Sequence, residues 1–111
     1  MDKIISFNNR TFQNIFKSGK SYGNKLLVIY YVSNGLDYNR LGITVSKKNG
    51  NSVVRHRVKR LIKESYRLND KKFVKGYDII FIARVGIENS SYCEVQSALK
   101  HLMKKNNLLE K

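Results

Sequence analysis

The amino-acid sequence predicts an α+β fold, a two-layer α/β sandwich in which three helices pack on a small mixed sheet. Its 111 residues are enough for one hydrophobic core, so we expect a single domain over residues 1–111. Apolar residues make up 41% of the chain, close to the average for globular proteins. Segments of helical and strand periodicity follow in the order helix, strand, strand, helix, strand, helix, and no proline or low-complexity tract divides them.

The first predicted element is a helix over residues 9–18. Phe12, Ile15 and Phe16 have the i, i+3, i+4 spacing of one helix face. Gly19 stands directly after the predicted helix, where a residue in the left-handed conformation would end it.

Two strands are predicted next. Residues 26–32 form a run of β-branched and aromatic residues that is typical of a strand buried on both faces. Turn-forming residues follow at 33–35 and 37–39. Apolar and small or polar residues then alternate over 41–46, as in a half-exposed strand, and residues 47–50 are predicted to form a loop.

The second half of the chain predicts a long helix, a strand and a last helix. Asn51 is a candidate N-cap for a helix that extends to about Asn69. Alternation over residues 77–84 predicts another strand. Ser91 and Glu94 have the spacing of a capping box, so the last helix is expected to start there and to continue through Met103.

Charge is the most unusual property of the chain. It has 22 Lys and Arg against 8 Asp and Glu, a net charge of +14. Residues 47–72 alone contain 10 basic residues and only two acidic ones. On the long helix the apolar arc consists of Val54, Val58, Leu61, Ile62, Ser65 and Leu68, and the opposite arc is mainly cationic. An ordinary solvated face mixes both signs, so this face predicts binding to nucleic acid.

Other interpretations of the same features stay open at this point. A membrane-surface helix is also basic and amphipathic, but the small aliphatic arc here is better suited to packing on a sheet. Phe12 and Phe16 are either core residues or a platform that stacks unpaired bases, and spacing alone favours the core. Arg57 lies at the edge of the apolar arc, with its stem expected along the core and its guanidinium in solvent.

Residues for catalysis by the protein itself are scarce. The eight carboxylates are scattered, and nothing indicates that Asp37, Asp78 and Glu94 converge on a metal. His56 and His101 are expected to be surface or packing residues, and Cys93 a small packing residue. The longest apolar run is too short to cross a bilayer, and residues 1–6 show no signal peptide. We therefore expect a cytoplasmic protein without a membrane partner.

Residues 50–64 resemble the signature of the bacterial ribonuclease P protein component, in which Gly-Asn-Ala-Val precedes Arg-Asn-Arg and then Lys-Arg. Residues 12–16, 19–21, 42–48 and 77–84 stand in the order and spacing of that family. His56 replaces the Asn of the Arg-Asn-Arg triplet, and Lys63 stands where many members have Arg.

The resemblance implies the protein subunit of ribonuclease P, in a sheet of about four strands that includes an unusual left-handed βαβ crossover. Such a subunit assists a catalytic RNA that removes the 5′ leader of precursor tRNA, and Mg²⁺ is held mainly by the RNA subunit and substrate. No catalytic or metal-binding residue is expected in the protein, which we expect to be monomeric alone.

The resemblance also implies two sets of binding residues. Those expected to bind the RNA subunit are Lys47, Lys48, Asn51, Arg55, His56, Arg57, Lys59, Arg60, Lys63 and Arg67. Those expected to bind the precursor-tRNA leader are Phe12, Phe16, Lys20 and Tyr30. For Phe12 and Phe16 the resemblance thus replaces the purely core role that spacing alone favours. A ribosomal or other structural RNA-binding protein is the alternative, and an autonomous nuclease is a third.

Overall fold

The computed structural model describes residues 9–110, and for residues 9–11 it describes the backbone alone. A four-stranded mixed sheet has the order β1-β2-β4-β3. Its strands are β1 (Lys20–Gly23), β2 (Leu27–Ser33), β3 (Arg40–Thr44) and β4 (Tyr77–Ala83). The α-helices are α1 (Asn9–Ser18), α2 (Ser52–Asn69) and α3 (Tyr92–Lys105), and the short 3-10 helices are η1 (Lys47–Asn49), η2 (Asp70–Lys72) and η3 (Ile87–Asn89). The predicted α+β fold is confirmed.

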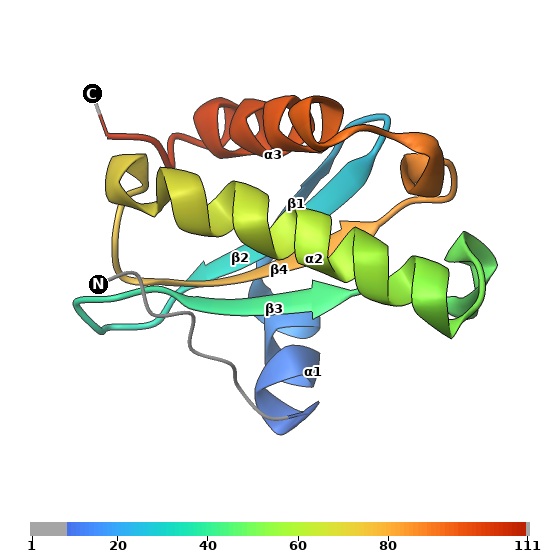
Figure 1. The fold of residues 1–111 in the computed structure, drawn as a ribbon. Coiled ribbons are helices and arrows are strands. Elements are labelled where there is room, and N and C mark those ends of the chain that lie inside the picture. Colours follow the sequence, from blue (N-terminus) through green and yellow to red (C-terminus); the bar gives the residue numbers. More distant parts are fainter. Residues whose placement is uncertain (1–8, 111) are drawn as a thin grey trace.

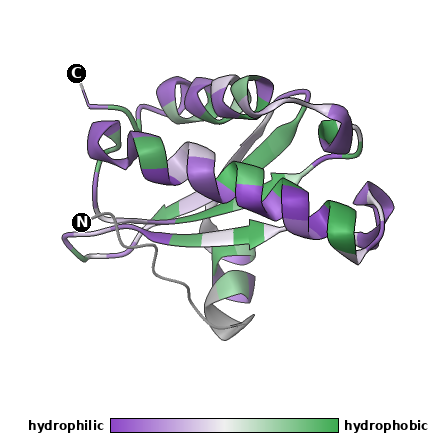
Figure 2. Ribbon diagram, viewed as in Figure 1, coloured by the Kyte–Doolittle hydropathy of each residue, from purple (hydrophilic) through white to green (hydrophobic). Residues whose placement is uncertain are grey.

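The helices lie on both faces of the sheet. α2 and α3 lie side by side over one face, and α1 packs against β2 on the other (Figure 1). The main core fills the space between the sheet and the α2–α3 layer, where Ile29 and Phe81 of the sheet meet Val58, Ile62 and Leu99 of the helices. Figure 2 shows hydrophobic residues along the central strands and alternating hydrophilic and hydrophobic segments along α2.

The strand that is buried on both faces is β4, and the prediction for residues 26–32 was wrong in this respect. Leu27 and Ile29 of β2 are buried under the α2–α3 layer, but Tyr30 on the opposite face is only half-buried. In β4, by contrast, consecutive residues Ile79 and Ile80 are both buried. Both strands are internal in the sheet, so the difference arises on the second face, which the short α1 covers only in part.

Two local features differ from expectation near the start of the sheet. β1, which pairs antiparallel with β2, was not predicted, because its four residues are all exposed and show no apolar alternation. Gly19 was predicted to have a left-handed conformation, but its φ is not positive. Its Cβ would lie 2.6 Å from the Ile15 carbonyl oxygen and 2.9 Å from that of Tyr31, so close backbone approach requires this glycine.

The long helix begins and ends where predicted, with Asn51 as its N-cap, but its buried face is displaced from the predicted arc in the last turns. Val58, Ile62 and Ser65 are buried as expected. Leu68 is 58% exposed, contrary to the prediction, while Tyr66 is only 3% exposed. The last turns of α2 contact α3 as well as Phe73, whose ring centroid is 5.0 Å from that of Tyr66. Which residues are buried there therefore depends on these neighbours and not only on the side of α2 that faces the sheet.

β3 and β4 are parallel neighbours connected through η1, α2 and η2. This connection is the βαβ unit for which the family resemblance implies a left-handed crossover, and its hand stays a prediction. The loop predicted for residues 47–50 contains the 3-10 helix η1. None of the helices within residues 9–110 is long and apolar enough to cross a membrane, and residues 1–6, for which no signal peptide was predicted, lie outside the described part.

Candidate RNA-binding surfaces

A buried asparagine fixes the segment that carries Lys47 and Lys48. Asn49 accepts a hydrogen bond from the Ser46 N–H at 3.2 Å, and its amide donates to the Arg84 carbonyl at 3.0 Å and to Glu88 Oε1 at 3.1 Å. The Glu88 carboxylate also accepts from the Gly86 N–H at 3.0 Å. Both lysine side chains are thus exposed on a segment tied to the far end of β4. The Ser-x-x-Asn spacing of residues 46–49 is a capping signal in the sequence that was not recognised as one.

The start of α2 is defined by two adjacent residues. The Asn51 side chain accepts a hydrogen bond from the Val54 N–H at 3.0 Å, so the predicted N-cap is confirmed. Gly50 has φ +137°, and a Cβ there would lie 2.9 Å from the Val54 Cβ. The turn between η1 and α2 is therefore tight, and it holds η1 against the start of α2.

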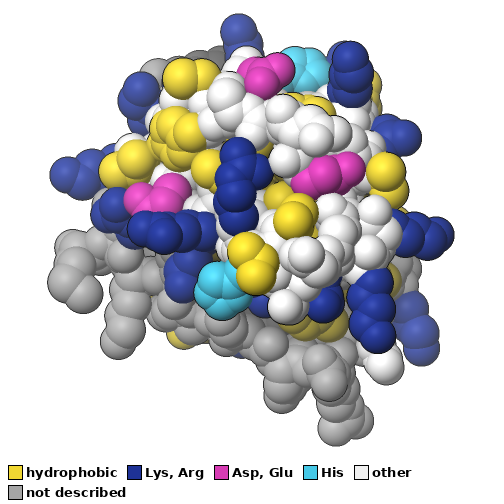
Figure 3. Space-filling model, turned by 45° about the vertical axis from the view of Figure 1, so that its right-hand side comes forward, with side chains coloured by type: hydrophobic (Ala, Val, Ile, Leu, Met, Phe, Trp, Pro, Cys, Tyr) yellow, Lys and Arg dark blue, Asp and Glu magenta, His cyan; other side chains and the backbone are white. Residues whose placement is uncertain are grey.

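We define the cationic face as the predicted RNA-subunit residues of η1 and α2. Seven basic members are exposed: Lys47, Lys48, His56, Arg57, Lys59, Arg60 and Lys63. Arg55 and Arg67 are half-buried. The Arg55 Nε atom is buried and has no hydrogen-bond partner among the described residues, so part of that side chain lies against the protein. Figure 3 shows that Lys and Arg outnumber Asp and Glu on the side of the molecule it presents.

Two arginines of the cationic face have protein partners. Arg57 donates to the backbone carbonyls of Glu88 at 3.1 Å and Ser90 at 3.3 Å, so its guanidinium is not simply solvated as predicted. Arg67 forms an ion pair of 2.9 Å with Glu64, one turn earlier on α2. The hydrogen bond from Arg67 lowers the pKa of the Glu64 carboxyl, which stays charged and offsets part of the local positive potential.

A groove opens beside the first turns of α2 on the cationic face. Its volume is about 500 Å³, and it is lined by Ser52, Val53, His56, Arg57 and Arg60. Two guanidinium groups and an imidazole around one groove can bind phosphate oxygens through several charged hydrogen bonds. His56, which stands where the family signature has Asn, is one of the residues that line this groove.

The predicted leader-binding aromatics form a contiguous cluster on the sheet face that α1 covers. The ring centroids of Phe12 and Phe16 are 6.2 Å apart, and those of Phe16 and Tyr30 are 4.9 Å apart with their planes at 89°. Phe16 is 41% exposed, while Ile15 between the two phenylalanines is buried and supplies the core contact of α1. The cluster therefore has accessible ring surface on which unpaired bases can stack.

Lys20, the fourth predicted leader residue, is not brought together with this cluster. It lies opposite Tyr31 in the β1–β2 pair, and such partners point to the same face of a sheet. Tyr31 packs with Tyr77 against the core on the α2–α3 side, with ring centroids 6.0 Å apart. Lys20 thus lies at the edge of the face opposite to Phe12, Phe16 and Tyr30.

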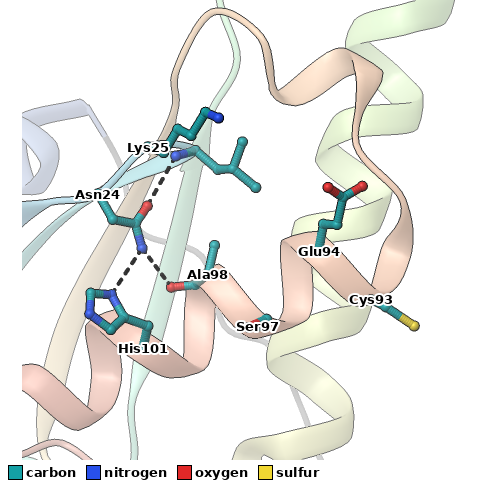
Figure 4. Close-up of a pocket in the computed structure, with 8 residues that line it drawn as sticks. Asn24, Lys25, Cys93, Glu94, Ser97, Ala98 and His101 are labelled. Atoms are coloured by element: carbon teal, nitrogen blue, oxygen red, sulfur yellow. Dashed lines mark hydrogen bonds between the residues drawn. The ribbon is translucent and has the colours of Figure 1, made fainter.

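A second groove, of about 550 Å³, separates α3 from the turn between β1 and β2. Asn24 closes one end by donating to the Ala98 carbonyl at 2.9 Å and by a 3.3 Å contact with His101 Nδ1 (Figure 4). His101 is therefore a surface residue with a partner. Cys93 is exposed, contrary to its predicted packing role, and its sulfur points away from Asn24 and His101 in Figure 4.

Several carboxylates of the described part have structural partners. Asp78 is buried and forms a bidentate ion pair with Arg40, with two contacts of 2.7 Å, and Glu94 caps α3 through the Ser91 N–H at 2.9 Å. Within residues 12–110 no group of three or more His, Cys, Asp or Glu side chains is placed to hold a metal ion.

Comparison with known proteins supplies the context for these surfaces. The family model described as Ribonuclease P matches residues 7–107. The ribonuclease P protein component of Alkaliphilus metalliredigens is 56% identical over 101 residues, which cover 91% of each chain. That of Lachnoclostridium phytofermentans is 54% identical over 92% of this chain and 88% of its own.

Solved structures agree with these sequence matches. The Staphylococcus aureus RNase P protein superimposes with a TM-score of 0.88 at 35% identity, covering 97% of this chain and 99% of that one. The Thermotoga maritima RNase P protein gives a TM-score of 0.86 at 34% identity, covering 93% and 97%. The sequence matches and the shared fold favour this family over the alternative of a ribosomal or other structural RNA-binding protein. The chain belongs to the ribonuclease P protein family.

Proposed function

We propose that this chain is the accessory protein subunit of a ribonuclease P, which binds a catalytic RNA and the single-stranded 5′ leader of precursor tRNA. The observation that carries the proposal is the presence of two different surfaces, a cationic face on η1 and α2 and an aromatic cluster between α1 and β2. Family membership supports the assignment of these surfaces to those two RNAs.

The cationic face suits a folded RNA because its exposed charges can replace the counterions condensed on phosphates. Release of these ions makes assembly favourable and dependent on salt. The proposed role of the protein is electrostatic and positional, and cleavage is assigned to the RNA subunit. The same charges would reduce repulsion between two RNAs, so the protein should lower the Mg²⁺ concentration that the RNA and its substrate require. The proposed site of action is the cytoplasm.

The aromatic cluster suits an unpaired leader because every base has a face that can stack on an aromatic ring. Contacts of this kind tolerate different leader sequences. Mature tRNA has no leader and cannot make them. Hence the protein should increase the affinity for precursor tRNA more than that for mature tRNA.

Reconstitution of the full chain with a candidate ribonuclease P RNA tests the proposal. Precursor and mature tRNA affinities are measured with each component omitted in turn. Phe16→Ala should reduce the affinity for precursor by about tenfold, the value of one lost stacking contact, and leave mature tRNA unchanged. Tyr38→Ala is the matched control, because Tyr38 and Phe16 are both 41% exposed and Tyr38 lies outside the cluster.

Two results would contradict the proposal. One is an unchanged gap between precursor and mature tRNA affinity when the protein is added to the RNA. The other is processing of precursor tRNA by the protein alone with Mg²⁺, which would instead support an autonomous nuclease. Co-purification with ribosomes and not with one RNA of the ribonuclease P type would support the structural RNA-binding alternative.

A further inference from the structure

A small cavity at one end of the sheet belongs to neither surface described above. Its volume is about 260 Å³, and it lies where α1, β1, β2 and β4 meet. The residues that line it are Ser18, Lys20, Tyr31, Val32, Ser33 and Tyr77. The volume is below that of typical sites for drug-sized ligands, so the cavity is suited to a single small planar group.

The chemistry of the lining combines one cation, two phenol rings and two hydroxyl groups. Tyr31 and Tyr77 are half-buried and meet edge to face, with their planes at 68°. None of the six lining residues is acidic. Burial raises the pKa of the Tyr31 phenol, and the nearby Tyr77 raises it further, so the Tyr31 phenol stays neutral at physiological pH. A ring face beside an ammonium group is the pattern that binds a base and its phosphate.

The position of the cavity relates it to the aromatic cluster. Tyr30 and Tyr31 are consecutive residues of β2 that point to opposite faces of the sheet. Ser18 ends α1 two residues after Phe16, and Ser33 ends β2 about 10 Å along the strand from Tyr30. A single strand of RNA that stacks on Phe16 and Tyr30 can therefore pass over this end of the sheet and reach Lys20.

We propose that this cavity binds one unpaired nucleotide of a single-stranded RNA, with the base against Tyr31 and Tyr77 and a phosphate at Lys20. The inference rests on the proposed function, because the strand that supplies the nucleotide is the leader bound by the aromatic cluster. It accounts for Lys20 as a leader contact despite its position on the opposite face. The leader is thus held on both faces of the sheet, and it reaches the second face by passing around the end of β2.

The experiment uses the full chain and single-stranded oligouridylates of increasing length. Lys20→Gln should weaken binding by about 3- to 10-fold and reduce the slope of log Kobs against log salt by about 0.7, the value for one phosphate of a single strand. Ser33→Phe, which fills the cavity, should weaken binding by at least about fivefold, as expected for one lost base contact. The ring resonances of Tyr31 and Tyr77 in NMR spectra should shift on titration, and Ser33→Phe should abolish these shifts.

Matched controls lie in the groove beside α3. Lys25→Gln removes the same charge and Ser97→Phe introduces the same ring, both at exposed positions outside the proposed surfaces. Both should bind oligouridylate like the unmodified protein. Unfolding free energies of all four variants establish that each is folded.

The outcomes separate this inference from the proposed function. If Phe16→Ala weakens oligouridylate and precursor binding but Lys20→Gln and Ser33→Phe do not, the cavity is not a nucleotide site and the proposed function stands. Equal effects of Lys20→Gln and Lys25→Gln, with no shift of the Tyr31 and Tyr77 resonances, would also overturn the inference. If none of the three site variants changes leader affinity, both proposals are wrong.

Discussion

Asn51 has a structural role and a proposed RNA-binding role, and one substitution can separate them. Asp caps a helix as well as Asn does, but its charge repels phosphate. Asn51→Asp should therefore leave the unfolding free energy within about 0.5 kcal/mol of the unmodified value and weaken binding to the RNA subunit. Asn51→Ser, which caps without a charge, should leave the unfolding free energy nearly unchanged and should weaken RNA binding less than Asn51→Asp does. Unaltered RNA affinity in Asn51→Asp would mean that Asn51 acts only as the cap of α2.

Arg57 and Arg60 share one groove but differ in their protein contacts. Arg57 donates to two backbone carbonyls, whereas Arg60 makes no hydrogen bond with any residue of the described part. Each change to Ala should reduce the salt slope of RNA binding by about 0.9, the value for one phosphate of a duplex. Only Arg57→Ala should also lower the unfolding free energy, by about 1 kcal/mol. Urea unfolding and salt-dependent binding measure both effects, and equal destabilisation by the two variants would contradict this division.

Glu88 gives the fold a specific dependence on pH. The pKa of its carboxyl lies below the usual value of 4.5 because its own backbone N–H, the Asn49 amide and the Gly86 N–H donate to the charged form. The stabilisation is complete above the unfolded-state pKa and is lost as pH falls through the lower pKa of the folded state. Glu88→Gln should therefore lose less unfolding free energy than the unmodified protein between neutral pH and about pH 3. Identical losses in urea unfolding would show that Glu88 is not stabilised in this way.

Individual side chains were predicted least well because their surroundings depend on distant parts of the chain. The solvated guanidinium expected for Arg57 instead meets carbonyls more than 30 residues later in the sequence. Cys93 is exposed because it lies on the outer side of α3, which the capping box alone could not specify. By contrast the caps Asn51 and Ser91 were predicted correctly, since each acts on a backbone N–H three residues away.

At the scale of elements, patterns that repeat over many residues were predictive and short ones were not. α2 and α3 combine caps with apolar periodicity, and both begin where expected. β1 has four residues that are all exposed, and it is a strand because β2 presents a free edge to it. The aromatic cluster was ambiguous from spacing, because α1 both packs on the sheet through Ile15 and leaves Phe16 accessible.

The junction between η1 and α2 depends on Gly50. Gly50→Ala would combine an unfavourable φ of +137° with a Cβ contact of 2.9 Å to Val54, so the start of α2 must shift. We expect a loss of about 2–3 kcal/mol in unfolding free energy and weaker binding to the RNA subunit, since η1 moves relative to α2. Gly86→Ala is the control, because φ there is +109° but no atom lies within 4 Å of the added Cβ. It should cost about 1 kcal/mol and leave RNA binding intact. Equal effects of the two changes would exclude a role for the contact with Val54.

At the scale of the whole molecule, the distribution of the net charge of +14 matters as well as its size. Lys59→Glu and Lys104→Glu both lower the net charge by two, but only Lys59 belongs to the cationic face. Lys59→Glu should raise the Mg²⁺ concentration needed for half-maximal cleavage by the reconstituted enzyme by about twofold or more, and Lys104→Glu should not. Cleavage measured over a range of Mg²⁺ concentrations tests this. The same increase in both variants would mean that total charge, and not its placement on α2, sets the requirement.

The sheet separates the cationic face from the aromatic cluster, and its strands are fixed to each other by continuous backbone pairing. The two surfaces therefore lie on opposite sides of a layer whose strands keep a fixed register. On the proposed function, the protein therefore holds the ribozyme and the emerging end of its substrate on opposite sides of a rigid sheet. Any adjustment for leaders of different shape then has to come from the nucleic acids, which are the more pliable components of the assembly.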